Sequence, residues 1–280
     1  MNPSSTLSTF VASDGENLAI QDWPLEPAQP LRGVVVLVHG LGEHAGRYDE
    51  VAERLNQWGF AVRGYDQYGH GESGGVRGGL PSDNRLLDDL ADVVDSTRSR
   101  FPKGTPLVLL GHSMGGLVAA RFVALKLRPV DGLVMSSPAL DPGLSPVQKL
   151  LVASLPKLAP NLSVTNGLEP DKISHDPEVV RAYVDDPLVH NRISARLARF
   201  IADGGPATVA AAPHWSVPTL LMYAGSDSLV NPQGSRDFAA AAPKKHVTTR
   251  CFDALYHELF NEPDREAVFA ELRRWLDSSI

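Results

Sequence analysis

Short apolar runs alternate with helical patterns along most of this chain, and no other feature limits its possible folds as strongly. The runs are GVVVLVHG (33–40), FAVRGYD (60–66), PLVLLGHS (106–113), VDGLVMSSP (130–138), VPTLLMYAGSD (217–227) and HVTTRCFDALYH (246–257). Such runs, apolar on both faces, are typical of parallel strands buried between two layers of helices. TFVAS (9–13) and NLAIQDW (17–23) predict two further strands joined by a turn. The chain is therefore predicted to have an α/β fold with a mainly parallel sheet of about eight strands.

The segments between these runs carry the periodicity of helices. YDEVAERLNQWG (48–59) stops on Gly59, a residue that commonly follows a helix. LVAARFVALKL (117–127) and EAVFAELRRWL (266–276) are helical in the same way. In DNRLLDDLADVV (83–94), a single helical face carries the apolar residues Leu86, Leu87, Leu90, Val93 and Val94. We expect these residues to face the core.

Residues 141–213 interrupt the alternation. This segment contains no convincing β run, and helix-like pieces such as SPVQKLLVASLPKL (145–158) stand between prolines. We expect a helical cap, residues 141–213, inserted into an α/β core made of residues 1–140 and 214–280. Insertions after the carboxyl edge of an open α/β sheet lie beside the ligand site, so the favoured interpretation is a lid over a substrate tunnel. A small helical subdomain with its own core is the alternative.

Two stretches match the pattern G-x-S-x-G, and their contexts differ. GHSMGG (111–116) follows a strongly apolar strand and leads directly into a helix, the arrangement that exposes a nucleophilic serine on a sharp turn. GHGESGG (69–75) is followed by VRGGLPSD, which cannot begin a helix. The second stretch also matches the dinucleotide pattern G-x-G-x-x-G, but that pattern needs the same missing helix. Ser113 is therefore the predicted nucleophile, and Ser73 is predicted to lie in a turn.

A serine nucleophile needs a general base that is oriented by a carboxylate, and the expected chain order is Ser, acid, His. Asp227 and His257 follow the ends of the last two predicted strands, at the same sheet edge as Ser113. His257 is the favoured base, and Asp227 is favoured over Asp253 as the acid. The oxyanion hole is expected to use the backbone N–H groups of Met114 and of Leu41, which follows the first parallel strand.

Composition excludes several classes of function. A formal net charge of −7 without a basic cluster argues against nucleic acid as a partner. No His pair has the spacing of a metalloprotease helix and the chain has no Cys cluster, so no metal is expected, and the serine chemistry needs no cofactor. The single cysteine, Cys251, is expected to be a small buried apolar residue. The N-terminal segment does not resemble a signal peptide, and no apolar run approaches the roughly 20 residues that span a bilayer. We expect a cytoplasmic protein.

The chain resembles the monoacylglycerol lipase and lysophospholipase group of the α/β-hydrolases, which is also placed with the serine aminopeptidases. The resemblance runs nearly end to end, through HGLGEHAGRY (39–48), DQYGHGESGG (66–75), GHSMGG (111–116), SSPAL (136–140), YVDDPLVH (183–190), GSDSLV (225–230) and YHELFNEP (256–263). It implies a Ser113–Asp227–His257 triad, oxyanion donors at Leu41 and Met114, and a glycerol head-group site that draws on Arg47, His112 and Tyr183. Position 41 is Leu where some members carry a smaller residue, which bears on the width of the pocket mouth.

The implied activity is hydrolysis of a monoacylglycerol to fatty acid and glycerol through an acyl-enzyme. A lysophospholipase, carboxylesterase or thioesterase with the same triad is the alternative, and a non-catalytic ligand-binding homologue is a more remote one. A dinucleotide-dependent oxidoreductase has only GHGESG in its favour. The apolar side of residues 145–158 suggests transient contact with a membrane or micelle through the cap, with plain packing onto the core as the rival interpretation. The oligomeric state stays open.

Overall fold

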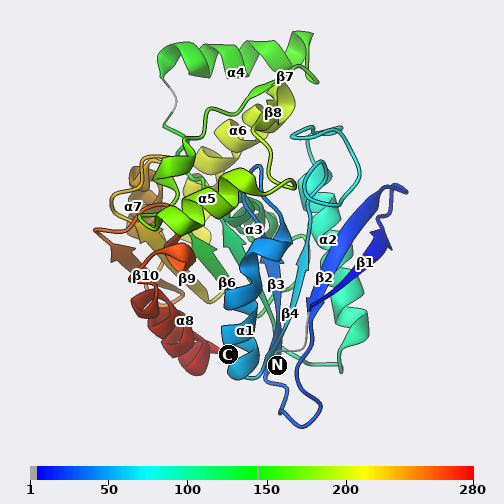
Figure 1. Ribbon diagram of the computed structural model, residues 1–280. Coiled ribbons are helices and arrows are strands. Elements are labelled where there is room, and N and C mark those ends of the chain that lie inside the picture. Colours follow the sequence, from blue (N-terminus) through cyan, green and yellow to red (C-terminus); the bar gives the residue numbers. More distant parts are fainter. Residues whose placement is uncertain (1–4, 144) are drawn as a thin grey trace.

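The computed structural model describes residues 5–143 and 145–280, apart from the side chains at 146, 147, 149 and 151. Its centre is an eight-stranded sheet in the order β1-β2-β4-β3-β5-β6-β9-β10 (Figure 1). The first two strands pair antiparallel, β2 also pairs antiparallel with β4, and the remaining neighbours are parallel. The strands are β1 Thr6–Val11, β2 Asn17–Trp23, β3 Gly33–Val38, β4 Phe60–Tyr65, β5 Leu107–His112, β6 Gly132–Ser136, β9 Thr219–Ala224 and β10 Val247–Phe252. The predicted α/β fold is confirmed.

Two hydrophobic clusters lie on opposite faces of the sheet. One contains apolar residues of α1 (Asp49–Gln57) and α8 (Glu266–Ser279), and the other contains those of α2 (Arg85–Arg100), α3 (Met114–Ala124) and α7 (Pro232–Ala241). Every residue of the central strands β3, β5, β6 and β9 is buried, because helices cover the sheet on both sides. The apolar face predicted for the helix α2 is buried at all five of its positions.

The chain between β6 and β9 extends beyond the carboxyl edge of the sheet, in the upper part of Figure 1, and returns toward β9 through α6 (Ala195–Ala211). It contains α4 (Pro146–Leu158), β7 (Ser163–Thr165), α5 (Pro177–Asp185), β8 (Arg192–Ser194) and α6, and α6 packs on α3. The antiparallel pair of β7 and β8 is absent from the sequence expectation. Strands of three residues are too short to show an alternating pattern, which explains the omission.

The GHGESGG loop is a tight turn. Gly69, Gly71 and Gly75 have φ of 72°, 48° and 96°, values that favour glycine. The Ser73 hydroxyl donates to the carbonyl of Asp66 at 2.5 Å and accepts the N–H of Ala19 at 2.8 Å. Ser73 is thus a buried structural residue within a turn, as its sequence context predicts.

One smaller expectation about the fold is wrong. Cys251 is only partly buried, because β10 is an edge strand of the sheet and has one side open to solvent. Its thiol donates to Oδ1 of Asp253 at 3.2 Å.

Among residues 5–143 and 145–280, no helix has the length and the apolar character that crossing a membrane requires.

Candidate active site

Ser113 lies on the turn between β5 and α3. Its backbone has φ 53° and ψ −120°, a conformation that residues with a side chain seldom adopt and that often marks functional positions. Hydrogen bonds to the last residue of β6 and to the chain that follows it hold this turn. The N–H of Ser113 donates to the carbonyl of Ser136 at 2.9 Å, and its carbonyl accepts the N–H of Ala139 at 3.0 Å.

The glycines beside Ser113 leave room for this turn. A Cβ at Gly115 would collide with the carbonyl oxygens of Val38 and His39, and one at Gly111 would collide with the carbonyl of Gly115. The strand β5, the helix α3 and the end of β3 therefore approach one another more closely than any other residue type would permit at these two positions.

Asp227 and His257 meet beyond the ends of β9 and β10. The Oδ2 atom of Asp227 lies 2.7 Å from Nδ1 of His257, and both side chains are buried. The Oδ1 atom of Asp227 accepts the N–H groups of Leu229 at 2.9 Å and Val230 at 3.0 Å. With the carboxylate fixed in this way and Nδ1 engaged, Nε2 is the ring atom of His257 that is left for proton transfer.

The environment of His257 favours its protonated form. Burial alone would lower the pKa of the imidazole, but the charge and hydrogen bond of Asp227 outweigh burial, and the pKa of His257 is raised above its ordinary value. Asp253, the other candidate acid, lies one residue beyond β10, where its carboxylate accepts the Cys251 thiol. The structure pairs the imidazole with Asp227.

The two predicted oxyanion donors, Leu41 and Met114, line the same cavity as Ser113. Met114 is the first residue of α3, so its N–H belongs to the N-terminal groups that have no partner within the helix. The loop before Leu41 lies against the serine, because a Cβ at Gly40 would be 3.3 Å from the Cβ of Ser113. Oε1 of Glu43 accepts the Gly40 N–H at 2.6 Å and holds this loop in place.

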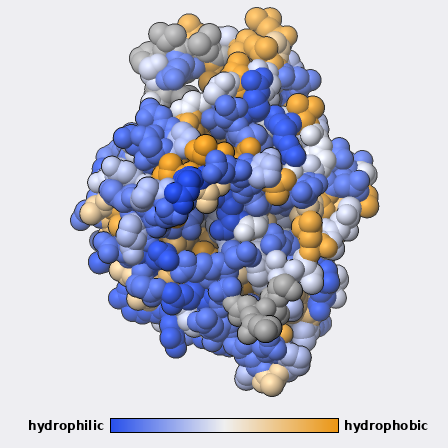
Figure 2. Space-filling view, in the orientation of Figure 1, coloured by the Kyte–Doolittle hydropathy of each residue, from blue (hydrophilic) through white to orange (hydrophobic). Residues whose placement is uncertain are grey.

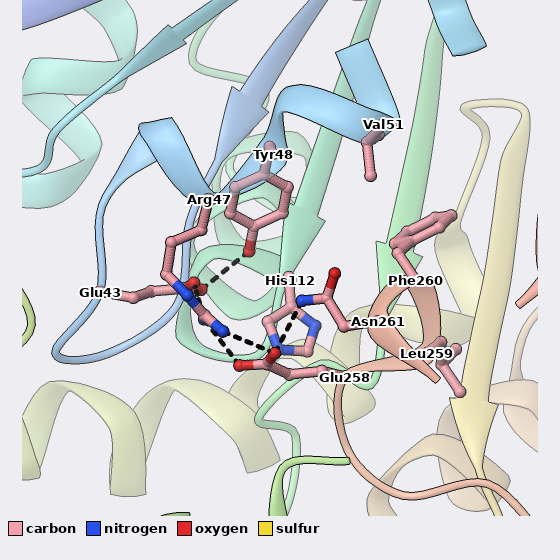
Figure 3. Close-up of a pocket in the computed structure, with 9 residues that line it drawn as sticks. All are labelled: Glu43, Arg47, Tyr48, Val51, His112, Glu258, Leu259, Phe260 and Asn261. Atoms are coloured by element: carbon pink, nitrogen blue, oxygen red, sulfur yellow. Dashed lines mark hydrogen bonds and ion pairs between the residues drawn. The ribbon is translucent and has the colours of Figure 1, made fainter. Parts of the chain in front are cut away.

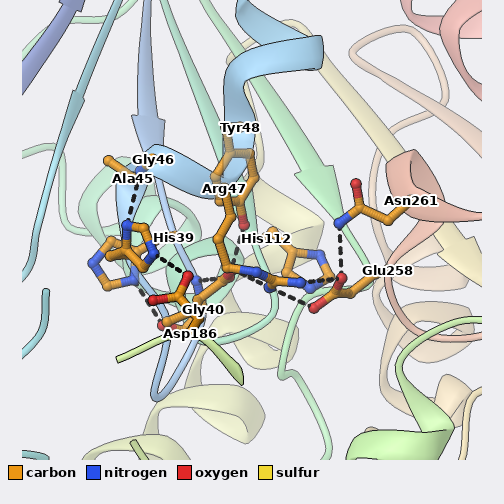
Figure 4. A network of polar contacts seen from close by, with 12 residues as sticks. His39, Gly40, Ala45, Gly46, Arg47, Tyr48, His112, Asp186, Glu258 and Asn261 are labelled. Carbon is orange, nitrogen blue, oxygen red and sulfur yellow. Dashed lines mark hydrogen bonds and ion pairs between the residues drawn. The ribbon is translucent and has the colours of Figure 1, made fainter. Parts of the chain in front are cut away.

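Arg47 joins two buried carboxylates next to these residues (Figure 3), and Figure 4 shows its contact with one of them, Glu258. Its Nη1 lies 2.6 Å from Oε2 of Glu43 and 2.7 Å from Oε1 of Glu258, and its Nη2 lies 2.8 Å from Oε2 of Glu258. Tyr48 donates its hydroxyl to Glu43 at 2.8 Å. Burial alone would raise the pKa of Glu43, but the Arg47 guanidinium lowers it to about 2. The network ties the loop after β3 to the residue that follows His257.

His112 and Tyr183, predicted with Arg47 to contact a substrate head group, lie at this network. The ring centroid of His112 is 4.7 Å from that of His257, and burial lowers the pKa of His112 to about 4. The ring of Tyr183, on α5, lies 4.7 Å from the guanidinium carbon of Arg47, and burial raises the pKa of Tyr183 to about 12. Arg47 and His112 border a cavity of about 10 Å³, roughly the space for one water molecule (Figure 3). The side chains of His112 and Tyr183 are therefore both neutral near pH 7.

The sequence predicted no role for Glu43 or for Glu258. Glu43 lies four residues before Arg47 but in the turn that precedes the 3-10 helix Ala45–Tyr48, so the helical spacing rule gives no signal for their contact. Glu258 directly follows the predicted base, but its partner Arg47 is 211 residues away in the chain, and only the fold brings the two together. Over the residues that the structure describes, no group of three or more His, Cys, Asp or Glu side chains is arranged to hold a metal ion.

A serine on a strained strand-to-helix turn of a mainly parallel sheet, with an Asp–His pair contributed later in the chain by the same sheet edge, defines the α/β-hydrolases. A profile of the family described as serine aminopeptidase, S33, matches residues 29–264. The chain belongs to this family.

Relatives and solved structures agree on the group within the family. The chain is 36% identical to a monoacylglycerol lipase of Mycolicibacterium smegmatis, with 99% of each chain covered. It is 33% identical to the phospholipase YtpA of Bacillus subtilis over 92% of this chain and 100% of that protein. The crystal structure of a Paleococcus ferrophilus monoacylglycerol lipase superimposes with a TM-score of 0.83 at 35% identity, covering 94% of this chain and 99% of that one. The resemblance to the monoacylglycerol lipase and lysophospholipase group is confirmed, and the protein is a serine ester hydrolase.

Proposed function

We propose that this hydrolase cleaves monoacylglycerols to fatty acid and glycerol. The observation that carries the proposal is a cavity of about 610 Å³ that begins at Ser113 and extends beneath the segment between β6 and β9. Its apolar lining includes Val152 and Leu155 of α4, Ile201 of α6, and Val230. A single acyl chain fits such a cavity, which extends from Ser113 along apolar side chains of the segment between β6 and β9.

In the proposed mechanism, Ser113 Oγ attacks the ester carbonyl while His257 Nε2 takes its proton. Asp227 holds the imidazole and stabilises its charged form, and the N–H groups of Leu41 and Met114 stabilise the oxyanion. The imidazolium then donates its proton to the leaving glycerol oxygen. A water molecule, activated by the same histidine, hydrolyses the acyl-enzyme and releases the fatty acid.

We propose that the glycerol head group lies near Arg47, His112 and Tyr183. Neutral His112 and protonated Tyr183 can exchange hydrogen bonds with hydroxyl groups. The guanidinium Nη atoms of Arg47 are already engaged by two carboxylates, so Arg47 contributes mainly by holding those carboxylates in place.

Substrate profiling tests the proposed activity. Purified enzyme is offered monoacylglycerols of increasing chain length, matched diacylglycerols, lysophosphatidylcholine and p-nitrophenyl acetate, and fatty acid release is measured. We expect monoacylglycerols to have the highest kcat/KM. The similarity to the Bacillus subtilis phospholipase makes lysophospholipase the second candidate. A higher kcat/KM on lysophosphatidylcholine would select it, and a preference for the acetate would indicate a general carboxylesterase.

We also propose that residues 141–213 form a cap over the cavity and that α4 contacts lipid aggregates. Leu158 and Leu150 are 85% and 68% exposed, and Leu162 and Val164 are also exposed. Figure 2 shows apolar surface at the top of the molecule, where α4 lies in Figure 1. Because burying one leucine in an apolar phase is worth roughly 1.5–3 kcal/mol, these side chains favour adsorption to lipid.

The double variant Leu150→Ser/Leu158→Ser tests the lipid contact. We expect it to reduce vesicle association about 10-fold or more, as measured by flotation with phosphatidylcholine vesicles. Leu7→Ser, at a similarly exposed leucine of β1, serves as the control and is expected to float like the wild type. Wild-type protein that stays at the bottom of the gradient would reject the lipid contact.

A further inference from the structure

The loop that carries His257 is held by a segment that lies more than 80 residues earlier in the chain. The N–H of Glu258 donates to the carbonyl of Ile173 at 2.8 Å. On the other side of the histidine, the ring of Tyr256 stacks on that of His175, with centroids 3.6 Å apart. Both neighbours of His257 thus contact the stretch Ile173–His175, which lies between β6 and β9.

Two buried polar side chains extend this contact. The hydroxyl of Ser174 donates to the carbonyl of Asn261 at 2.9 Å. The carboxylate of Glu262 accepts the backbone N–H of His175 at 2.9 Å, and its other oxygen lies 2.8 Å from the Nδ1 atom of His175. Ser174 and Glu262 are 2% and 1% exposed. A buried carboxylate is costly unless it is hydrogen bonded, so Glu262 ties its loop firmly to this segment.

The opposite side of the same loop is held by the core. The carboxylate of Glu258 accepts hydrogen bonds from both Nη atoms of Arg47. It also accepts a hydrogen bond from the side-chain amide of Asn261, at 2.7 Å. Asp227 orients the imidazole itself through Nδ1. The backbone position of His257 therefore depends on contacts from two directions, of which one comes from residues 173–175.

We propose that Ser174 and Glu262 are positioning residues for His257, so that residues 173–175 are part of the device that aligns the base. The proposal rests on the proposed role of His257 as general base. Proton transfer requires hydrogen-bond geometry between the serine and the imidazole, and a displacement of about 1 Å can lower the rate roughly 100-fold. Freeing the loop would allow such a displacement without altering any group that touches the substrate.

The test compares Ser174→Ala, Glu262→Ala and Glu262→Gln with the wild type on two esters. One is p-nitrophenyl acetate, whose acyl group is too short to reach into the large cavity, and the other is a long-chain monoacylglycerol. We expect Ser174→Ala and Glu262→Ala to lower kcat about 10- to 100-fold on both esters by the same factor, with KM within about twofold. Glu262→Gln keeps an oxygen acceptor for the His175 N–H and is expected to recover most of the rate.

Ser163→Ala is the matched control, because it removes a hydroxyl whose hydrogen bond, to Arg192, lies within the β7–β8 pair. It is expected to keep wild-type kinetics. Unchanged kcat on the acetate with a raised KM for the long-chain ester would overturn the proposal, since residues 173–175 would then shape only the acyl cavity. Wild-type kinetics in both Ala variants would overturn it as well.

Two measurements keep the result decisive. Thermal unfolding and near-ultraviolet circular dichroism establish that each variant is folded; should Glu262→Ala not fold, Ser174→Ala, which loses a single oxygen, decides the outcome. The second-order rate of labelling by a fluorophosphonate reports activation of the serine without any ester substrate. A wild-type enzyme that reacts with this probe but does not hydrolyse monoacylglycerols would refute the proposed substrate. The labelling rates of Ser174→Ala and Glu262→Ala, relative to the wild type, would then decide the positioning role.

Discussion

Ser113→Ala is expected to lower kcat/KM for every ester by roughly 10⁴- to 10⁶-fold, because the substitution removes the attacking oxygen. The residual rate would come from binding and the oxyanion donors alone. The turn itself should persist, since alanine has the same Cβ as serine and the backbone bonds of Ser113 to Ser136 and Ala139 do not involve its hydroxyl. Steady-state hydrolysis and fluorophosphonate labelling of the folded variant measure the effect.

Ser73→Ala is the matched control, because it alters the other G-x-S-x-G serine of the chain. We expect near wild-type kcat/KM together with a loss of about 1–3 kcal/mol in the free energy of unfolding. The loss arises because the buried N–H of Ala19 is left without its acceptor. Retained turnover in Ser113→Ala, or lost turnover in a folded Ser73→Ala, would show that the nucleophile has been assigned to the wrong serine.

Asp227→Asn is expected to lower kcat about 10⁴-fold with little change in KM. An amide can donate a hydrogen bond to Nδ1 and so favour the wrong tautomer of His257, and it cannot stabilise the imidazolium. The effect also has a pH signature. The base works in its neutral form, and its pKa is raised in the wild type, so kcat/KM should rise as pH climbs through that raised pKa.

In Asp227→Asn the rising limb should move to lower pH, because burial remains while the carboxylate that raised the pKa is gone. Profiles of kcat/KM from pH 5 to 9 measure this shift. Asp253→Asn is the control and should keep both the rate and the profile, since Asp253 bonds the Cys251 thiol. A large loss in Asp253→Asn with normal activity in Asp227→Asn would reverse the assignment of the acid.

The sheet and its helices could be predicted because apolar runs and helical periodicity are local signals. The turn at Ser113 was predictable for the same reason, since a strand, small residues and a helix stand side by side in the sequence. The contact of Arg47 with Glu258, and those between residues 173–175 and the His257 loop, join segments distant in the chain. Their residue types are common on protein surfaces, and nothing local distinguishes them from solvated charges.

The burial of Cys251 was misjudged for a related reason. Whether a strand lies in the middle or at the edge of a sheet depends on the order of all strands, which the pattern of a single strand does not contain. The pair β7–β8 was missed because each strand is too short to carry a period.

The chain leaves the sheet at the end of β6 and re-enters it in β9, the neighbouring strand. Because β6 and β9 are parallel, this segment leaves the sheet at its carboxyl edge and returns at the opposite edge, where β9 begins. Replacing the part that lines the cavity with that of a relative, while keeping this crossover, is a natural route to altered acyl-chain preference. The contacts of residues 173–175 limit this modularity. A grafted segment would have to reproduce the partners of Tyr256, Glu258, Asn261 and Glu262, so selectivity and turnover would not be inherited independently in such chimaeras.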